Sequence, residues 1–172
     1  MRGILLTVVL TVVVTSAPAL APNVAAKEPD NAFISIKTLA FVVENAKDGD
    51  RGNENRKPMP DKVTPGTVVE YEITGKNDSE KTVIDLPTVG AVPEHTHYVE
   101  DSARLSVDGV IQYSYDGGET FSAPPVTRSE TQKGGGKRRI LVLPEDYTHV
   151  RFMVDQLGPG DEYVGTYRVR VE

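Results

Sequence analysis

The chain has 172 residues, a formal net charge of −6 and no cysteine. This length predicts one domain with a real hydrophobic core. The acidic balance argues against a general nucleic-acid-binding protein, which needs a basic face, and the missing cysteines exclude disulfides and a cysteine nucleophile. Abundant Val and Thr, with 15 Gly and 12 Pro, favour short strands and turns over helices.

The first 26 residues have the pattern of a secretory signal peptide. Arg2 precedes an apolar run at 3–14, and small residues with prolines follow. Cleavage after Ala26 is favoured, and cleavage after Ala21 is the alternative. The apolar run is shorter than the roughly 20 residues that span a bilayer, which argues against a retained anchor. We therefore expect a signal peptide at 1–26 and one exported domain at 27–172, with no stable membrane span.

The first strand is predicted at 33–43, as a long edge strand. Its apolar phase slips near Lys37 and Thr38, which predicts a bulge or a switch between sheets there. The polar segment 45–62 that follows is predicted to be a long loop.

Oxygen ligands alternate along part of this loop, as Ca²⁺ prefers. The calcium candidates are Asp48, Asp50, Asn53 and Asn55. The spacing lacks the twelve-residue EF-hand pattern and its bidentate Glu, so a flexible polar loop is favoured over a metal site.

A second strand is predicted at 67–75, between turns at 63–66 and 76–81. Its alternation places Val69, Tyr71 and Ile73 in the core and the intervening residues, including Glu70, in solvent. Short strands are predicted at 82–86, 96–99 and 104–107.

A hairpin is predicted across Asp116, Gly117 and Gly118, because a tight turn needs the positive φ that glycine supplies. Tyr113, Tyr115 and Phe121 are then expected to meet on the core face. Beyond it, 124–136 is predicted to be a second long loop and 139–143 a strand. The basic cluster at 133–139 is interpreted as solvated loop or edge-strand charge.

Two strictly alternating runs end the chain, at 148–154 and 162–171. Joined by the turn residues 157–161, they predict two antiparallel strands paired with each other. Phe152 lies on the apolar phase and Arg151 on the charged phase. Because an apolar face must be covered, the pattern predicts an all-β, antiparallel β-sandwich of about eight or nine strands.

The remaining polar and aromatic residues give no strong site. His95, His97 and His149 lack a zinc signature and are interpreted as ordinary surface residues. No pattern of a nucleophile, a paired carboxylate or a phosphate-binding loop is present, so no catalytic residue and no cofactor is predicted. The tyrosines fall mostly on the inward phase and are interpreted as core rather than as a carbohydrate platform. They are Tyr98, Tyr113, Tyr115, Tyr163 and Tyr167.

Five ordered segments resemble a bacterial cell-envelope family, the conserved repeat domain catalogued as domain of unknown function number eleven. They are VTPGTVVEYEI at 63–73, ND at 77–78, VPEHTHYV at 92–99 with Ser102, YSYDGGETF at 113–121, and LGPGD at 157–161. The resemblance implies an immunoglobulin-like sandwich, export, and a structural or adhesive role without catalysis. The family often occurs as tandem repeats, whereas this sequence holds one copy, which favours a periplasmic or secreted module.

The sequence therefore predicts an exported, non-enzymatic module that contacts another envelope or surface protein. Its edge strands or its two long loops would make the contact. The alternative is a Ca²⁺- or small-ligand-binding domain that uses the 45–62 loop. The sequence leaves the binding partner and the oligomeric state open.

Overall fold

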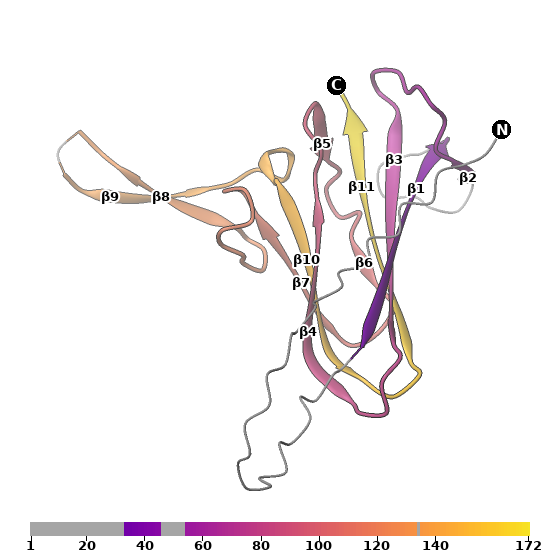
Figure 1. Ribbon diagram of the computed structural model, residues 1–172. Coiled ribbons are helices and arrows are strands. Elements are labelled where there is room, and N and C mark those ends of the chain that lie inside the picture. The colour runs from indigo at the N-terminus through magenta and orange to yellow at the C-terminus, as the bar shows by residue number, and fades with distance from the viewer. Residues whose placement is uncertain (1–32, 46–53, 134) are drawn as a thin grey trace, which may run out of the picture. The chain divides into compact units, whose positions relative to one another are not determined.

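The computed structural model describes residues 33–45, 54–133 and 135–172, and all its strands belong to one compact unit. Within these residues the chain is all-β, with antiparallel strands and one 3₁₀ helix, η1 (Figure 1). The elements are β1 Ile34–Glu44, β2 Asn55–Pro58, β3 Val68–Asn77, β4 Val83–Ala91, β5 Thr96–Tyr98, β6 Arg104–Leu105, β7 Gly109–Ser114, β8 Thr127–Thr131, β9 Lys137–Leu141, η1 Pro144–Asp146, β10 His149–Leu157 and β11 Glu162–Val171. In the described part of the chain, no helix is long and apolar enough to cross a membrane.

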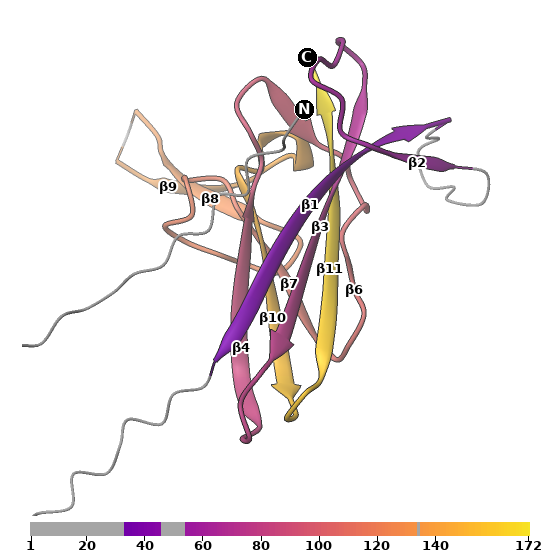
Figure 2. The same cartoon turned by 45° about the vertical axis from the view of Figure 1, so that its right-hand side comes forward.

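The strands form a larger sheet, a smaller sheet and a separate two-stranded ladder. The larger sheet has the order β2-β1-β3-β11-β5, with β6 also paired to β11, and the smaller has the order β4-β10-β7. Figures 1 and 2 show these two sheets side by side. One buried cluster joins them, because Val150 and Phe152 of β10 pack with Tyr167 and Val169 of β11. The arrangement is consistent with the predicted β-sandwich.

The two terminal strands do not pair with each other, so the hairpin predicted for them is wrong. Met153 of β10 lies opposite Pro87 of β4 and Val110 of β7, whereas Tyr167 of β11 lies opposite Tyr71 of β3. The turn between β10 and β11 therefore carries the chain from one sheet to the other. Alternation indicates which face of a strand is buried, but it does not indicate which strand is the neighbour.

Three other local predictions are also corrected. β1 pairs with β3 without interruption, from Ile34 opposite Asn77 to Val43 opposite Val68, so there is neither a bulge nor a switch between sheets near Lys37 and Thr38. The predicted loop at 45–62 contains β2, which pairs with the end of β1. The predicted loop at 124–136 contains β8, which pairs with β9.

The hairpin aromatics are only partly placed as expected. Tyr113 is buried and Tyr115 packs against the core cluster. Phe121 instead lies beneath the guanidinium of Arg151, whose Cζ is 4.2 Å from the ring centroid. Arg151 occupies the phase opposite to the fully buried Phe152, as the sequence predicts.

Aromatic rings packed on glycine backbone hold the two sheets at close distance. A Cβ added to Gly165 of β11 would lie 2.8 Å from the ring of Phe152, and one added to Gly90 of β4 would lie 2.5 Å from the ring of Tyr167. The Tyr167 ring is buried, and its hydroxyl donates a 2.6 Å hydrogen bond to the carbonyl of Ala91. Four of the five tyrosines predicted to be core are buried, and they are Tyr98, Tyr113, Tyr163 and Tyr167.

Replacing Gly90 with alanine should destabilise the fold. The new methyl group would overlap the Tyr167 ring, which its hydrogen bond and its buried surroundings keep in place, so we expect a loss of about 1–3 kcal/mol in the free energy of unfolding. Chemical denaturation of the purified chain measures this loss.

Gly136→Ala is the matched control, because its Cβ would meet nothing closer than 3.8 Å. The control should change the free energy of unfolding by less than about 1 kcal/mol in either direction. Equal losses in the two variants would contradict the close packing of Tyr167 on Gly90.

Candidate interaction surface

The ladder of β8 and β9 projects from the two packed sheets as an arm, defined here as the described residues 126–133 and 135–142 (Figure 1). Its register runs from Thr127 opposite Leu141 to Thr131 opposite Lys137. All strand residues of the arm are exposed except Ile140, which is half-buried. Among the described strands, β8 and β9 pair only with each other. The arm therefore presents both of its faces and both of its outer edges to solvent.

The core anchors the base of the arm. Val126 and Val142 are buried members of the core cluster, and the Val142 N–H donates a 2.9 Å hydrogen bond to the Val126 carbonyl. At the tip, the Gln132 N–H donates to the Gly136 carbonyl at 2.8 Å. The arm is thus a hairpin that begins in the core and continues into solvent.

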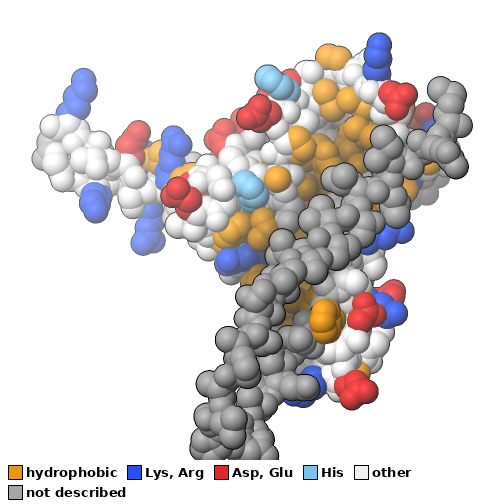
Figure 3. All heavy atoms as spheres, viewed as in Figure 1, with side chains coloured by type: hydrophobic (Ala, Val, Ile, Leu, Met, Phe, Trp, Pro, Cys, Tyr) orange, Lys and Arg blue, Asp and Glu red, His pale blue; other side chains and the backbone are white. Residues whose placement is uncertain are grey.

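The charge of the arm is opposite to that of the remaining chain. Five basic residues and one Glu give the arm a formal charge of +4. Because the whole chain carries −6, the remaining residues together carry −10. The basic residues are Arg128, Lys133, Lys137, Arg138 and Arg139. Figure 3 shows Lys and Arg side chains gathered over the arm.

The two faces of the arm differ in chemistry. Directly opposed residues of an antiparallel ladder share a face. One face therefore carries Lys137 and Arg139 with the hydroxyl residues Thr127, Ser129 and Thr131, and it has no acidic residue. Lys137 and Arg139 can bind a carboxylate, and the hydroxyls can add hydrogen bonds.

A groove of about 590 Å³ is formed in part by residues that follow the arm in the sequence. It is lined by residues 97–101 and 143–145 and by Arg170, and residue 143 follows the end of β9 by two positions. Glu100, Asp101 and Glu145 give the groove three exposed carboxylates. We call it the acidic groove.

The three histidines lie apart from one another or pair with a carboxylate. His97 lies on β5 with its Nε2 3.0 Å from the Glu172 carboxylate and its Nδ1 3.3 Å from the Glu145 carbonyl oxygen. His95 is exposed and its Nδ1 is 3.9 Å from the same carboxylate. His149 lies in the smaller sheet, beside Thr148. Within the described residues, no three His, Asp or Glu side chains gather as a metal would require.

The calcium candidates are mostly beyond what the structure describes. Asp48, Asp50 and Asn53 lie outside the described residues. Asn55 is the first residue of β2, where it is exposed and lies opposite Glu44. Its assignment to a strand corrects the prediction that this position belongs to a loop.

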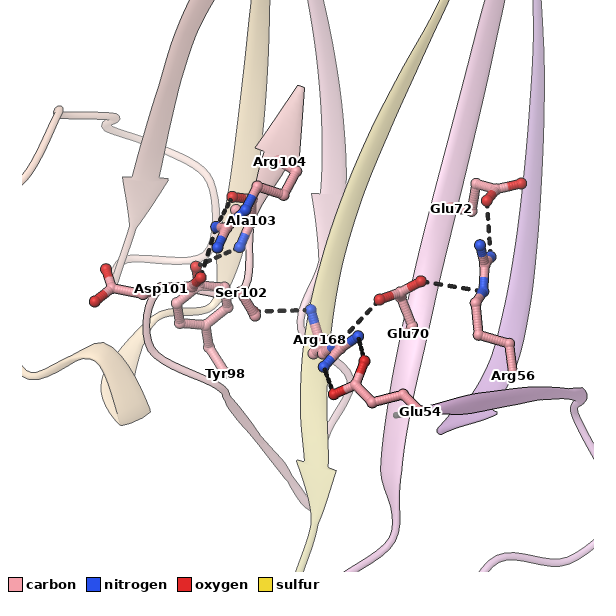
Figure 4. A network of polar contacts seen from close by, with 10 residues as sticks. All are labelled: Glu54, Arg56, Glu70, Glu72, Tyr98, Asp101, Ser102, Ala103, Arg104 and Arg168. Atoms are coloured by element: carbon pink, nitrogen blue, oxygen red, sulfur yellow. Dashed lines mark hydrogen bonds and ion pairs between the residues drawn. The ribbon is translucent and has the colours of Figure 1, made fainter. Parts of the chain in front are cut away.

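A buried polar network covers part of the outer face of the larger sheet (Figure 4). Arg168 of β11 and Glu70 of β3 are 6% and 2% exposed, and the Arg168 Nε donates to Glu70 at 2.8 Å. The other two nitrogens of Arg168 donate to the Glu54 carboxylate at 2.7 and 2.5 Å. Arg56 of β2 pairs with both Glu70 and Glu72. The Glu54 hydrogen bonds raise the pKa of Arg168 against the opposing effect of burial, so the guanidinium stays charged.

This network is structural, because its charges satisfy one another and hold the start of β2 on the sheet. It also corrects the prediction that Glu70 faces solvent. Glu70 does lie on the charged face of β3, but Glu54, just before β2, and Arg56 of β2 cover that face.

Removing Arg168 should destabilise the fold strongly. Arg168→Met leaves the Glu70 and Glu54 carboxylates without their main cation, and breaking a buried pair in this way typically costs about 3–5 kcal/mol. Lys57→Met is the control, since the Lys57–Glu44 pair is exposed at both ends and such pairs contribute less than about 1 kcal/mol. Urea unfolding of both variants gives the comparison, and equal losses would show that the Arg168 network is solvated.

The Asp116 carboxylate is engaged within its own turn. It accepts hydrogen bonds from the Ser114 hydroxyl at 2.7 Å and the Thr120 N–H at 2.9 Å, and from the Thr120 hydroxyl. These hydrogen bonds lower the pKa of Asp116 from 3.8 to about 2, and the hydrogen bond from Ser114 has the largest effect. Gly117 and Gly118 have φ of 78° and 90°, as the predicted tight turn requires.

The turn should make stability depend on acid pH. Because the pKa of Asp116 is lower in the folded state, its carboxylate stabilises the fold above about pH 4, and this stabilisation is lost as pH falls toward 2. Asp116→Asn has no such titration, so the variant should be less stable than wild type at neutral pH, and the difference should shrink in acid. Urea unfolding at neutral pH and near pH 2.5 measures both differences. A difference that does not change with pH would contradict this role of the carboxylate.

The sequence predicted a strand at 139–143, which overlaps β9, but β8 and the buried network were missed, for different reasons. All residues of β8 are exposed, so this strand carries no apolar alternation. The alternating hydroxyl residues Thr127, Ser129 and Thr131 ahead of three glycines were the available indication. For the network, the sequence shows an acidic residue at 70 and a basic one at 168. It does not show that Glu70 and Arg168 lie opposite each other on the neighbouring strands β3 and β11.

No family model, curated protein or solved structure matches this chain.

Proposed function

We propose that this chain is an exported, non-enzymatic, immunoglobulin-like β-sandwich module that makes protein–protein contacts in the bacterial cell envelope. The arm is the contact surface. Export is supported by the signal-peptide pattern at 1–26, and the immunoglobulin-like class by the family resemblance over 63–171 together with two antiparallel sheets around a shared core.

The projecting arm is the observation that carries the proposal. A ladder with exposed outer edges can accept an added strand through main-chain hydrogen bonds. Its Lys and Arg side chains disfavour edge-to-edge aggregation and favour an acidic partner.

Site-specific photo-crosslinking in intact producing cells tests the proposal. A photo-reactive residue at Ser129 on the arm should give discrete crosslinked species in the envelope fraction. The same residue at Glu80, an exposed position in the turn between β3 and β4, is the matched control and should not. No product from Ser129, or the same products from both positions, would contradict the arm as the contact surface.

A further inference from the structure

We propose that the partner of the arm is a second copy of this chain, and that the arm of each copy lies in the acidic groove of the other. This inference rests on the proposed function, since it names the partner of the same surface.

Charge complementarity points to this partner. The arm carries +4, and the groove is lined by three carboxylates and one arginine, Arg170, so each molecule offers both a basic surface and an acidic one. Glu100, Asp101 and Glu145 of the groove form no ion pair among the described residues, and neither do the basic residues of the arm. These unneutralised charges of opposite sign favour association and orient the encounter.

Apolar surface lies at the same place. Leu141, at the end of the basic face, is 60% exposed, and Leu143, in the lining of the groove, is 48% exposed. Burial of such side chains supplies the non-directional part of an interface, while the charges set its register. The basic face and the groove thus each combine charge with one exposed leucine.

The arm does not reach its own groove with its tip. Five residue pairs keep the ladder extended over roughly 17 Å. Figures 1 and 2 both show it leading away from the packed sheets. Folding the tip back would require breaking the ladder, so a groove on another molecule is the available site.

A single two-fold axis satisfies both contacts. Because the groove-lining residues 143–145 follow the arm directly in the chain, the groove includes the base of the arm, and two arms that run antiparallel can each reach the groove of the other molecule. Such an exchange is isologous and closed, and it produces a dimer and not a filament.

Charge-swapped variants test the exchange in solution. The full chain, as purified from the producing cell, is compared by sedimentation equilibrium with an arm variant, Lys137→Glu/Arg139→Glu, and with a groove variant, Glu100→Lys/Glu145→Lys. We expect a dimer for wild type, a dissociation constant raised at least about tenfold in each variant alone, and recovery in their equimolar mixture. The mixture recovers because each heterodimer contains one native contact and one reversed contact.

Lys37→Glu/Lys62→Glu is the control, since it makes the same change in net charge at exposed positions away from the arm and should leave the dimer intact. Thermal melts of all variants verify folding. A dimer that neither variant weakens, or a mixture that stays monomeric, overturns the exchange. A monomeric wild type that still crosslinks a different envelope protein through Ser129 overturns this inference alone, whereas a monomer without arm crosslinks overturns the proposed function as well.

Discussion

The contact of aromatic rings with glycine backbone between the two sheets is the constraint on which the rest of the structure depends. Phe152 packs on Gly165 and Tyr167 on Gly90, so each sheet supplies a ring to the other. Such contacts need a missing side chain on one strand and a buried ring on the other, and they fix how β10 and β11 cross. Because β10 also pairs with β7, the same core sets the direction in which the chain leaves toward the arm.

The second constraint lies on the opposite face of the larger sheet. Burying Arg168 with Glu70 and Glu54 gives little net stability compared with an apolar cluster of the same size, because each charge must leave water. Its geometry is directional, however, since the guanidinium binds Glu54 through two nitrogens and Glu70 through the third. We interpret the network as a device that fixes where β2 begins on the sheet.

The sequence predicted several features that depend on the alternation of apolar residues along a strand. The phase of Phe152 against Arg151 was correct, and so was the burial of Tyr163 and Tyr167, because an apolar period of two identifies the inner face of a strand. The positive φ of Gly117 and Gly118 was also predicted, since few other residues adopt it.

Strand partners could not be predicted in the same way. The pairing of β10 with β4 and β7 depends on contacts between residues distant in the sequence. The first strand of the arm, β8, was missed because Thr127, Ser129 and Thr131 are exposed, and the ion network because Glu54 and Arg168 are 114 positions apart in the sequence. The part of the molecule that we propose as functional is therefore the part with the weakest sequence pattern.

Residues 126–133 and 135–142 form a ladder that is fixed to the core, and not a loop. Val126 and Val142 anchor it, and each of its five residue pairs is in register. Such a ladder fixes the backbone that carries the basic side chains, so less backbone entropy is lost when a partner binds. Native-state hydrogen exchange of the amides in this segment is the most direct test. The account predicts slow exchange at the Val142 amide, which bonds to Val126, and measurable protection at Gln132, which bonds to Gly136. Exchange throughout the segment at the rate of an unstructured chain would contradict it.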